Sequence, residues 1–210
     1  MNAPTEIGDL VERAVDALRK GGIIGLPTDT QYALSTLASD GAAVMHCYAL
    51  KQRPDDDAMP ILLPSLHWLD RVATDIPAGA RALAAEVWPG AITLILPRNP
   101  NWRSLAVPGK TVAVRIPNHP LALALLAALD EPLTGSSANR HGEPPALRAN
   151  DVHASFADAV TVLPELGVLP QGSASTILAW SGAEPEIVRP GALSSEQIEA
   201  LLQRHCAVGS

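Results

Sequence analysis

The chain has few aromatic residues and few cysteines, and both shortages narrow its possible functions. Aromatic residues make up 3% of the 210 residues. The core must therefore be built from Ala, Leu, Val and Ile, and few rings are left for stacking on nucleic-acid bases. The two cysteines, Cys47 and Cys206, belong to no CxxC pair, which argues against zinc. A disulfide framework is also disfavoured, and a reducing cytoplasm is the expected compartment.

The sequence also lacks a basic run and a long apolar run. The formal net charge is −7 at pH 7. Broad attraction to nucleic acid is therefore not expected, although this net charge is compatible with a local basic groove. The N-terminus MNAPTEIGDL has no apolar segment of a secretory signal. The longest apolar run follows Pro120 and is about half the length of a membrane span, so no membrane association is expected.

Hydrophobic periodicity and capping residues predict helices and strands that mix along the chain. Predicted helices occupy 7–18, 41–51, two segments opened by Ser65 and Pro77, 119–129 with Asn118 as the cap, and a final helix with a capping box of Ser194 and Gln197. Predicted strands occupy 22–26, 60–64, 91–96, 111–117, 132–136, 159–163, 175–180 and 185–189. The order predicts one α/β or α+β domain over residues 1–210, with a mixed sheet.

Hydroxyl and amide side chains gather in loops next to these predicted strands. The three clusters are Thr28, Asp29 and Thr30; Ser136, Ser137 and Asn139; and Ser173, Ser175 and Thr176. Ligands of α/β proteins usually bind at strand ends. Turn formation and helix capping are the favoured explanation of any one cluster, but three clusters together favour a site.

Four cations are candidates for an anion pocket. Arg115 lies within a strand and shares one face with Ala113, so it needs an anionic partner if that face is buried. If that face is exposed, water solvates the guanidinium and no anionic partner is needed. Arg189 ends another strand, Lys51 lies in the last turn of the second predicted helix, and Arg53 follows that helix. Should all four converge, they would suit phosphates and a carboxylate.

Several common catalytic motifs are absent. A phosphate loop of the GxxxxGK[ST] type fails because residue 104 is Ser, and neither GxSxG nor HExxH occurs. The acidic run 55–57 leaves two interpretations open: a divalent-cation site that faces a phosphate, or an exposed charged loop.

Seven short blocks occur in order between about residues 15 and 192. They read PTDTQYAL, KQRP, WPGAITLIL, TVAVRIPNHP, SSANRHGEPP, GSASTI and VRPG. Together they resemble the YrdC-like domain of threonylcarbamoyl-AMP synthases. The resemblance implies a single α/β domain with a twisted mixed sheet and a concave, positively lined cavity. We expect the short form, without the second C-terminal domain of longer members.

The resemblance also implies an activity. Such a nucleotidyltransferase condenses L-threonine, bicarbonate and ATP into threonylcarbamoyl-AMP and pyrophosphate, with Mg²⁺ accompanying ATP and no organic cofactor. A separate complex would transfer the threonylcarbamoyl group to a tRNA adenosine, so any RNA contact of this chain would be weak or local. No protein nucleophile is required, because the enzyme needs only to hold two anionic reactants together, and no particular residue is predicted as a metal ligand.

The resemblance assigns binding and catalytic roles to particular residues of these motifs. The resemblance implies that Lys51 and Arg53 are catalytic, facing the ATP phosphates or the carbamate. It implies threonine contacts for Thr30, Arg115 and Thr176, and nucleotide contacts for Arg53, Thr111, Ser137, Asn139 and Arg189.

Two positions depart from the family pattern. Ala33 replaces a usual glycine and adds a methyl group. Asp57 stands where a lysine or asparagine usually contacts ATP, and its charge should weaken phosphate binding unless Mg²⁺ or a loop shift compensates. These departures favour an alternative, in which the chain is a paralogue that binds nucleotide or RNA without this synthase activity.

Overall fold

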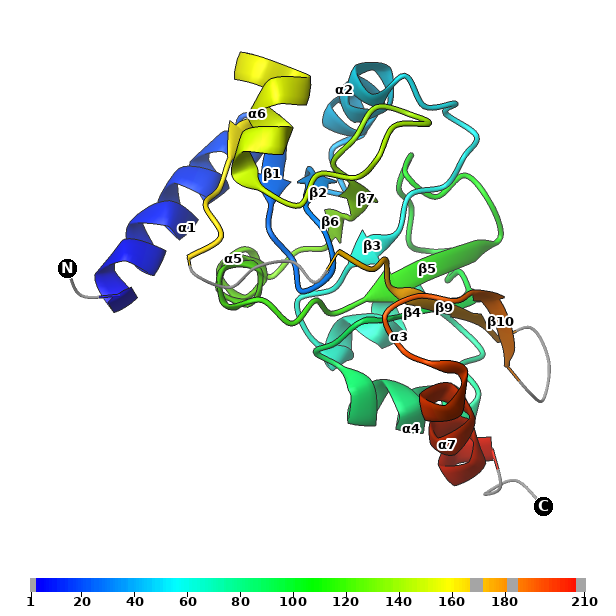
Figure 1. Cartoon of the computed structure of the whole chain (residues 1–210). Coiled ribbons are helices and arrows are strands. Elements are labelled where there is room, and N and C mark those ends of the chain that lie inside the picture. Colours follow the sequence, from blue (N-terminus) through cyan, green and yellow to red (C-terminus); the bar gives the residue numbers. More distant parts are fainter. Residues whose placement is uncertain (1–2, 167–171, 181–184, 207–210) are drawn as a thin grey trace.

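The fold is known from a computed structural model of the chain, shown in Figure 1, which describes residues 3–166, 172–180 and 185–206. Side chains are described from Glu6 to Arg204 within those ranges. The prediction of a mixed α/β fold is confirmed, but the strands form two mixed sheets instead of one.

The smaller sheet has four strands in the order β7-β2-β1-β8. Their bounds are β7 (Ser136–Ser137), β2 (Ala33–Ser35), β1 (Ile24–Leu26) and β8 (Thr161–Val162). β1 runs antiparallel to β2 and parallel to β8, and β2 runs antiparallel to β7. β2 was not predicted, because its three residues are all buried and show no alternation of polar and apolar positions.

The larger sheet has six strands in the order β10-β9-β4-β5-β3-β6. Their bounds are β10 (Glu186–Arg189), β9 (Thr176–Ala179), β4 (Ile92–Pro97), β5 (Thr111–Arg115), β3 (Ile61–Leu62) and β6 (Leu133–Thr134). The pairs β9–β4 and β5–β3 are parallel, and the other three are antiparallel. An isolated bridge between Leu37 and Leu133 links the region after β2 to the larger sheet.

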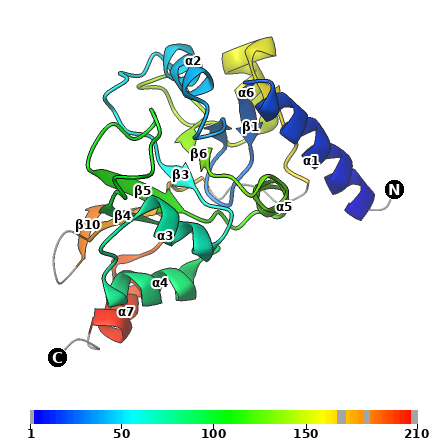
Figure 2. The same ribbon diagram turned by 180° about the vertical axis from the view of Figure 1, so that it is seen from behind.

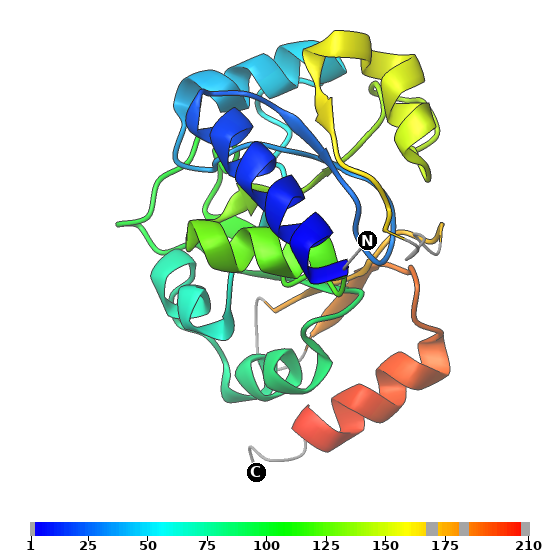
Figure 3. The same ribbon diagram turned by 90° about the vertical axis from the view of Figure 1, so that its left-hand side faces the viewer.

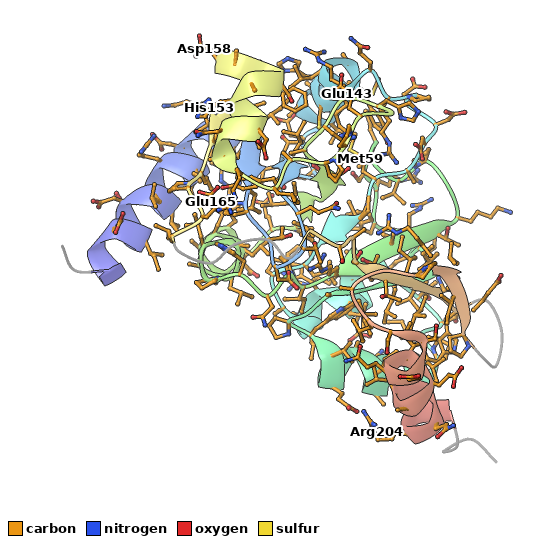
Figure 4. The ribbon with its side chains drawn as sticks, viewed as in Figure 1. Met59, Glu143, His153, Asp158, Glu165 and Arg204 are labelled. Carbon is orange, nitrogen blue, oxygen red and sulfur yellow. The ribbon has the colours of Figure 1, made fainter. Side chains whose placement is uncertain are left out.

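Helices cover both ends of this arrangement. They are α1 (Ala3–Arg19), α2 (Gly41–Lys51), η1 (Leu66–Trp68), α3 (Leu69–Val72), α4 (Ala78–Val87), α5 (Pro120–Leu129), α6 (Ala149–Phe156), η2 (Ala157–Ala159) and α7 (Ser195–Cys206). In Figures 1 and 2, α3, α4 and α7 lie at one end of the molecule and α2 and α6 at the other. Helix α7 packs on α4, where Arg204, labelled in Figure 4, lies 2.6 Å from Glu86.

Leu, Ala, Ile and Val dominate the core, as the composition predicts. Helices α1 and α5 pack against each other (Figure 3), with Leu10, Ala14 and Leu18 of α1 in the same cluster as Leu121 and Leu125 of α5. Residues of both sheets and of α2, α4 and α7 form a second cluster. None of the described helices is long and apolar enough to cross a membrane.

The helix ends confirm one predicted cap and correct another. The capping box of α7 is confirmed, since Ser194 N donates to Gln197 Oε1 at 2.9 Å and Gln197 N donates to Ser194 Oγ at 3.2 Å. The predicted Asn118 cap of α5 is wrong, because His119 is the N-cap and its Nδ1 accepts from Leu121 N. Asn118 instead donates its backbone N–H to Asp29 Oδ1 at 2.9 Å.

Of the two cysteines, Cys47 lies in the core. It is a buried free cysteine whose pKa burial raises to about 11, so it stays a thiol near neutral pH. The side chain of Cys206 lies outside the described residues.

Candidate functional site

A cavity of about 320 Å³ lies between the two sheets. The smaller sheet contributes residues from β2 and β7, and the larger sheet contributes residues from β3, β4, β5, β9 and β10. Loops 28–32, 53–60 and 174–175 complete the wall. The cavity wall is thus assembled from segments that are far apart in the sequence.

Alternation along the strands of the larger sheet decides which residues face the cavity. Thr111, Ala113 and Arg115 of β5 line it, whereas Val112 and Val114 are buried in the core. The predicted sharing of one face by Ala113 and Arg115 is therefore confirmed. Thr93 and Ile95 of β4 line the cavity by the same rule, and sequence reasoning missed Thr93.

A β-bulge turns Arg189 toward the cavity. Ile187 of β10 pairs with Leu178, and the next register position is Arg189 with Ile177, so Val188 is the additional residue. Such an insertion re-aims the following side chain. Because Ile177 lines the cavity and Leu178 belongs to the core, the shift places Arg189 on the cavity side.

Arg115 is held at the inner end of the cavity by three groups. Only 6% of it is exposed. Its Nε donates to Gly90 O and its Nη1 to Thr30 Oγ1, both at 2.8 Å, and its Nη2 pairs with Asp29 Oδ1. Burial lowers the pKa of Arg115, and the Asp29 carboxylate opposes that change. Asp29 is the anionic partner that the buried strand face requires, and no local pattern of residues indicates this long-range pair.

Hydroxyl groups are fixed beside Arg115. Thr28 Oγ1 lies 3.1 Å from Thr30 Oγ1 and also contacts the backbone of Thr30 and Gln31, so Thr28 shapes the loop that presents Thr30. Ser136 also lines the cavity, and its buried Oγ has no partner among the described residues. A bound ligand could therefore satisfy that hydroxyl.

Two further arginines lie nearer the solvent. Arg53 donates from Nε to Asp57 O at 3.0 Å and from Nη2 to Ala58 O at 2.9 Å, and it forms an ion pair with the Asp57 carboxylate. Arg189 donates from Nη2 to Ser175 O at 2.8 Å. Burial lowers the pKa of Arg189. Of the four candidate cations, Arg53, Arg115 and Arg189 thus converge on one cavity, and Lys51 does not line it.

Three of the predicted site residues lie beneath the residues that line the cavity. Lys51, Asn139 and Thr176 are not among the residues that line the cavity. Lys51 is 2% exposed, and its Nζ donates to Ser137 O and to Asn139 O, the latter at 2.6 Å. Thr176 is fully buried, and its Oγ1 accepts from Leu193 N at 3.2 Å. In this structure these side chains support the loops that carry lining residues.

The other expected site residues have mixed positions. Thr30, Thr111 and Ser137 line the cavity, as does Ala33, one of the two departures from the family pattern. The acidic run 55–57 is exposed. Among the residues that the structure describes, no group of three or more His, Cys, Asp or Glu side chains is placed to hold a metal ion.

The buried charge of Lys51 leads to a prediction about pH. Burial lowers the pKa of Lys51 from 10.5 to about 8. Between these values the unfolded chain binds a proton that the folded protein does not, so the Lys51 contribution to stability rises with pH. The difference in unfolding free energy between the wild type and Lys51→Met should shift by about 2–3 kcal/mol in favour of the wild type when the pH is raised from 7.5 to 10.5.

Urea denaturation at several pH values measures this gain. Lys20→Met, which removes an exposed lysine directly after α1, is the control for a general effect of losing one positive charge. If the wild-type and Lys51→Met stabilities ran parallel over this pH range, the pKa of Lys51 would not be lowered in the folded protein.

Comparison with known proteins identifies the family. A family model named Sua5_yciO_yrdC, described as "Telomere recombination", matches residues 16–191. The chain belongs to the Sua5/YciO/YrdC family. Its relatives include the threonylcarbamoyl-AMP synthase of Chromohalobacter salexigens, which is 40% identical over 159 residues, covering 75% of this chain and 86% of that protein.

Solved structures of family members share the fold. Sua5 of Pyrococcus abyssi, complexed with L-threonine, has a TM-score of 0.84 and 32% identity over 91% of this chain and 57% of its own. YciO of E. coli has a TM-score of 0.79 and 27% identity over 90% of this chain and 92% of its own. The chain thus matches nearly all of YciO and little more than half of Sua5.

Proposed function

We propose that the protein is a threonylcarbamoyl-AMP synthase that condenses L-threonine, bicarbonate and ATP, with release of pyrophosphate. The observation that carries this proposal is the convergence of Arg53, Arg115 and Arg189 on one cavity that also contains several hydroxyl groups. Family membership and the 40% identical synthase support the same activity. The product would serve the modification of a tRNA adenosine.

Burial separates two ends of the cavity and suggests how the reactants are arranged. Arg115 and Thr30 are buried at the inner end, where a desolvated arginine binds a carboxylate most strongly. We place L-threonine there. Arg53 and Arg189 are more exposed, and we place the ATP phosphates between them, so that pyrophosphate leaves through the open end.

In this arrangement the protein acts by positioning and charge stabilisation. The threonine amine and bicarbonate form the carbamate with loss of water, and a carbamate oxygen attacks the α-phosphate as the bond to pyrophosphate breaks. Arg53 and Arg189 would stabilise the charge on the phosphates. The hydroxyls of Thr30, Ser136 and Ser137 would orient the reactants.

Mg²⁺ is proposed to enter with ATP. Protein sites commonly hold Mg²⁺ through substrate phosphates with few carboxylate ligands, and a cavity of arginines and hydroxyls fits the phosphates themselves. When bound, Mg²⁺ would lower the negative charge of the polyphosphate. The net charge of −7 limits any tRNA contact to a local surface.

The activity is tested by incubating the protein with threonine, bicarbonate and Mg-ATP and measuring pyrophosphate release. Release should depend on threonine, and Arg189→Ala should lower kcat/KM about 10- to 100-fold through loss of one charge-assisted contact. Arg189 has no described carboxylate partner, so its removal leaves no buried anion unpaired. Arg103→Ala, an exposed arginine outside the cavity, is the control. No threonine-dependent release above the Arg189→Ala level would overturn the proposal.

A second function has specific support. The ion pair of Asp57 with Arg53 and the methyl group of Ala33 in the cavity wall favour a protein that binds nucleotide or RNA without condensing it with threonine. Calorimetry distinguishes the two functions. ATP affinity that increases with threonine supports the synthase, and RNA binding without threonine-dependent ATP binding supports the alternative.

A further inference from the structure

The three cavity arginines differ in how their charges are balanced. Arg115 pairs with Asp29 and Arg53 pairs with Asp57. Arg189 donates to the backbone and hydroxyl of Ser175, and the structure describes no carboxylate beside it. Anionic ligands of this cavity therefore meet three arginines, of which two already have an internal counter-anion.

The two internal carboxylates differ in how readily they could be displaced. The Asp29 side chain is 13% exposed and that of Asp57 is 47% exposed. Moving Asp29 away would leave a buried Arg115 without a partner, which is costly. Asp57 can instead turn into solvent and remain hydrated there. The pair with Arg53 is thus the one that an anionic ligand can open.

The Asp57 carboxylate is not needed to orient Arg53. The guanidinium is already fixed by two backbone carbonyls, with Nε donating to Asp57 O at 3.0 Å and Nη2 to Ala58 O at 2.9 Å. Replacing the carboxylate by an amide would leave both bonds in place. What the carboxylate adds is negative charge, 2.9 Å from Nη2.

That charge limits how Arg53 can bind a phosphate. Arginine binds phosphate best with two parallel N–H donors. Here Nη2 is shared by Ala58 O and the Asp57 carboxylate, and Nη1 has no partner among the described residues. A phosphate therefore approaches through Nη1, and a second bond from Nη2 requires the carboxylate to move.

We propose that Asp57 is an internal competitor for the polyphosphate that Arg53 binds and that it sets the affinity of the outer end of the cavity. The inference rests on the proposed placement of phosphates beside Arg53. Asp57 thus tunes the affinity for the ligand. We expect the outer end of the cavity to discriminate less strongly between highly and weakly charged phosphate ligands than Arg53 and Arg189 would without Asp57.

The test is a titration of the whole chain with inorganic pyrophosphate by calorimetry, at about 0.15 M salt so that distant charges are screened. Asp57→Asn should bind pyrophosphate about 3- to 10-fold more tightly than the wild type, because one partly screened charge next to the ligand is removed. Asp56→Asn, which makes the same charge change in the same exposed loop without a described ion pair, should change the affinity less than about 2-fold.

The outcomes separate this inference from the proposed function. Weaker binding by Asp57→Asn would show that the carboxylate positions Arg53, and equal changes in both asparagine variants would show a nonspecific charge effect; either result overturns the inference. Loss of affinity only when Mg²⁺ is present would show that Asp57 binds the metal and would overturn it too. Arg53→Ala is the reference: if it leaves pyrophosphate binding unchanged, the placement of the phosphates is itself wrong.

Discussion

Replacing Asp29 by alanine should lower the free energy of unfolding by about 3–5 kcal/mol. The substitution leaves the Arg115 guanidinium buried without its carboxylate, and the Arg115 side chain is only 7% exposed. It also removes the acceptor of the Asn118 backbone N–H. Urea or thermal unfolding measures the loss directly.

A surface ion pair in the same chain is the matched control. Arg81 and Asp70 form two hydrogen bonds, but their side chains are 49% and 56% exposed. Asp70→Ala should therefore cost about 1 kcal/mol or less. The double variant Asp29→Ala, Arg115→Met should recover part of the loss, because no buried charge is left unpaired. A cost of Asp29→Ala no greater than that of Asp70→Ala would contradict a stabilising role for the buried pair.

Features that depend on neighbouring residues could be predicted from the sequence. The capping box of Ser194 and Gln197 forms both of its bonds, because its partners are three residues apart. Alternation correctly predicted that Ala113 and Arg115 share one face of β5, because every second side chain of a strand points to the same side of the sheet. The ordered blocks of motif residues likewise indicated the family, because each block is a short continuous stretch of the chain.

Features that depend on distant pairing could not be predicted. β2 pairs with β7, about a hundred residues away, through Ala33 and Ser137, and it has no local pattern of a strand. Asp29 and Arg115 are separated by 86 residues. The division of the strands into two sheets follows from such pairings. The sequence therefore predicted mixed strand directions, but it did not predict that the strands form two separate sheets.

The direction in which a side chain points is not fixed by its sequence motif. Lys51 lies where the motif predicts, in the last turn of α2, yet its Nζ reaches the backbone of Ser137 and Asn139. A motif fixes the position along the chain, whereas the surrounding packing decides whether the group lines a cavity or supports its wall. Asp57 shows the same point, because its pairing with Arg53 depends on how the loop folds back.

The segment after β10 crosses directly over the start of β9, and this crossing holds Arg189 in place. Ala192 N donates to Ala174 O at 2.8 Å, and Arg189 Nη2 donates to Ser175 O at 2.8 Å. At Gly191 the two backbones are so close that a Cβ would lie 2.5 Å from both Ser175 C and Thr176 N. Only glycine fits at this approach without a shift of the backbone.

Gly191→Ala should therefore weaken both the fold and the site. The methyl group would push the crossing segment away from β9, which we expect to cost about 1–3 kcal/mol of unfolding free energy, as overpacking usually does. The shift would also move Arg189 out of contact with Ser175, so binding of ATP should weaken about 10- to 100-fold, as for loss of one charge-assisted contact. Chemical denaturation and calorimetry measure the two effects.

Gly109→Ala is the matched control for this substitution. Gly109 precedes β5 near the same cavity, and the atom nearest to its added Cβ would be Thr111 N, 4.0 Å away, which is an ordinary contact. It should bind ATP like the wild type and unfold at a similar denaturant concentration. If Gly191→Ala lost stability but kept its ATP affinity, Arg189 would hold its place without the crossing segment, and the link between this crossing and the nucleotide end of the cavity would be refuted.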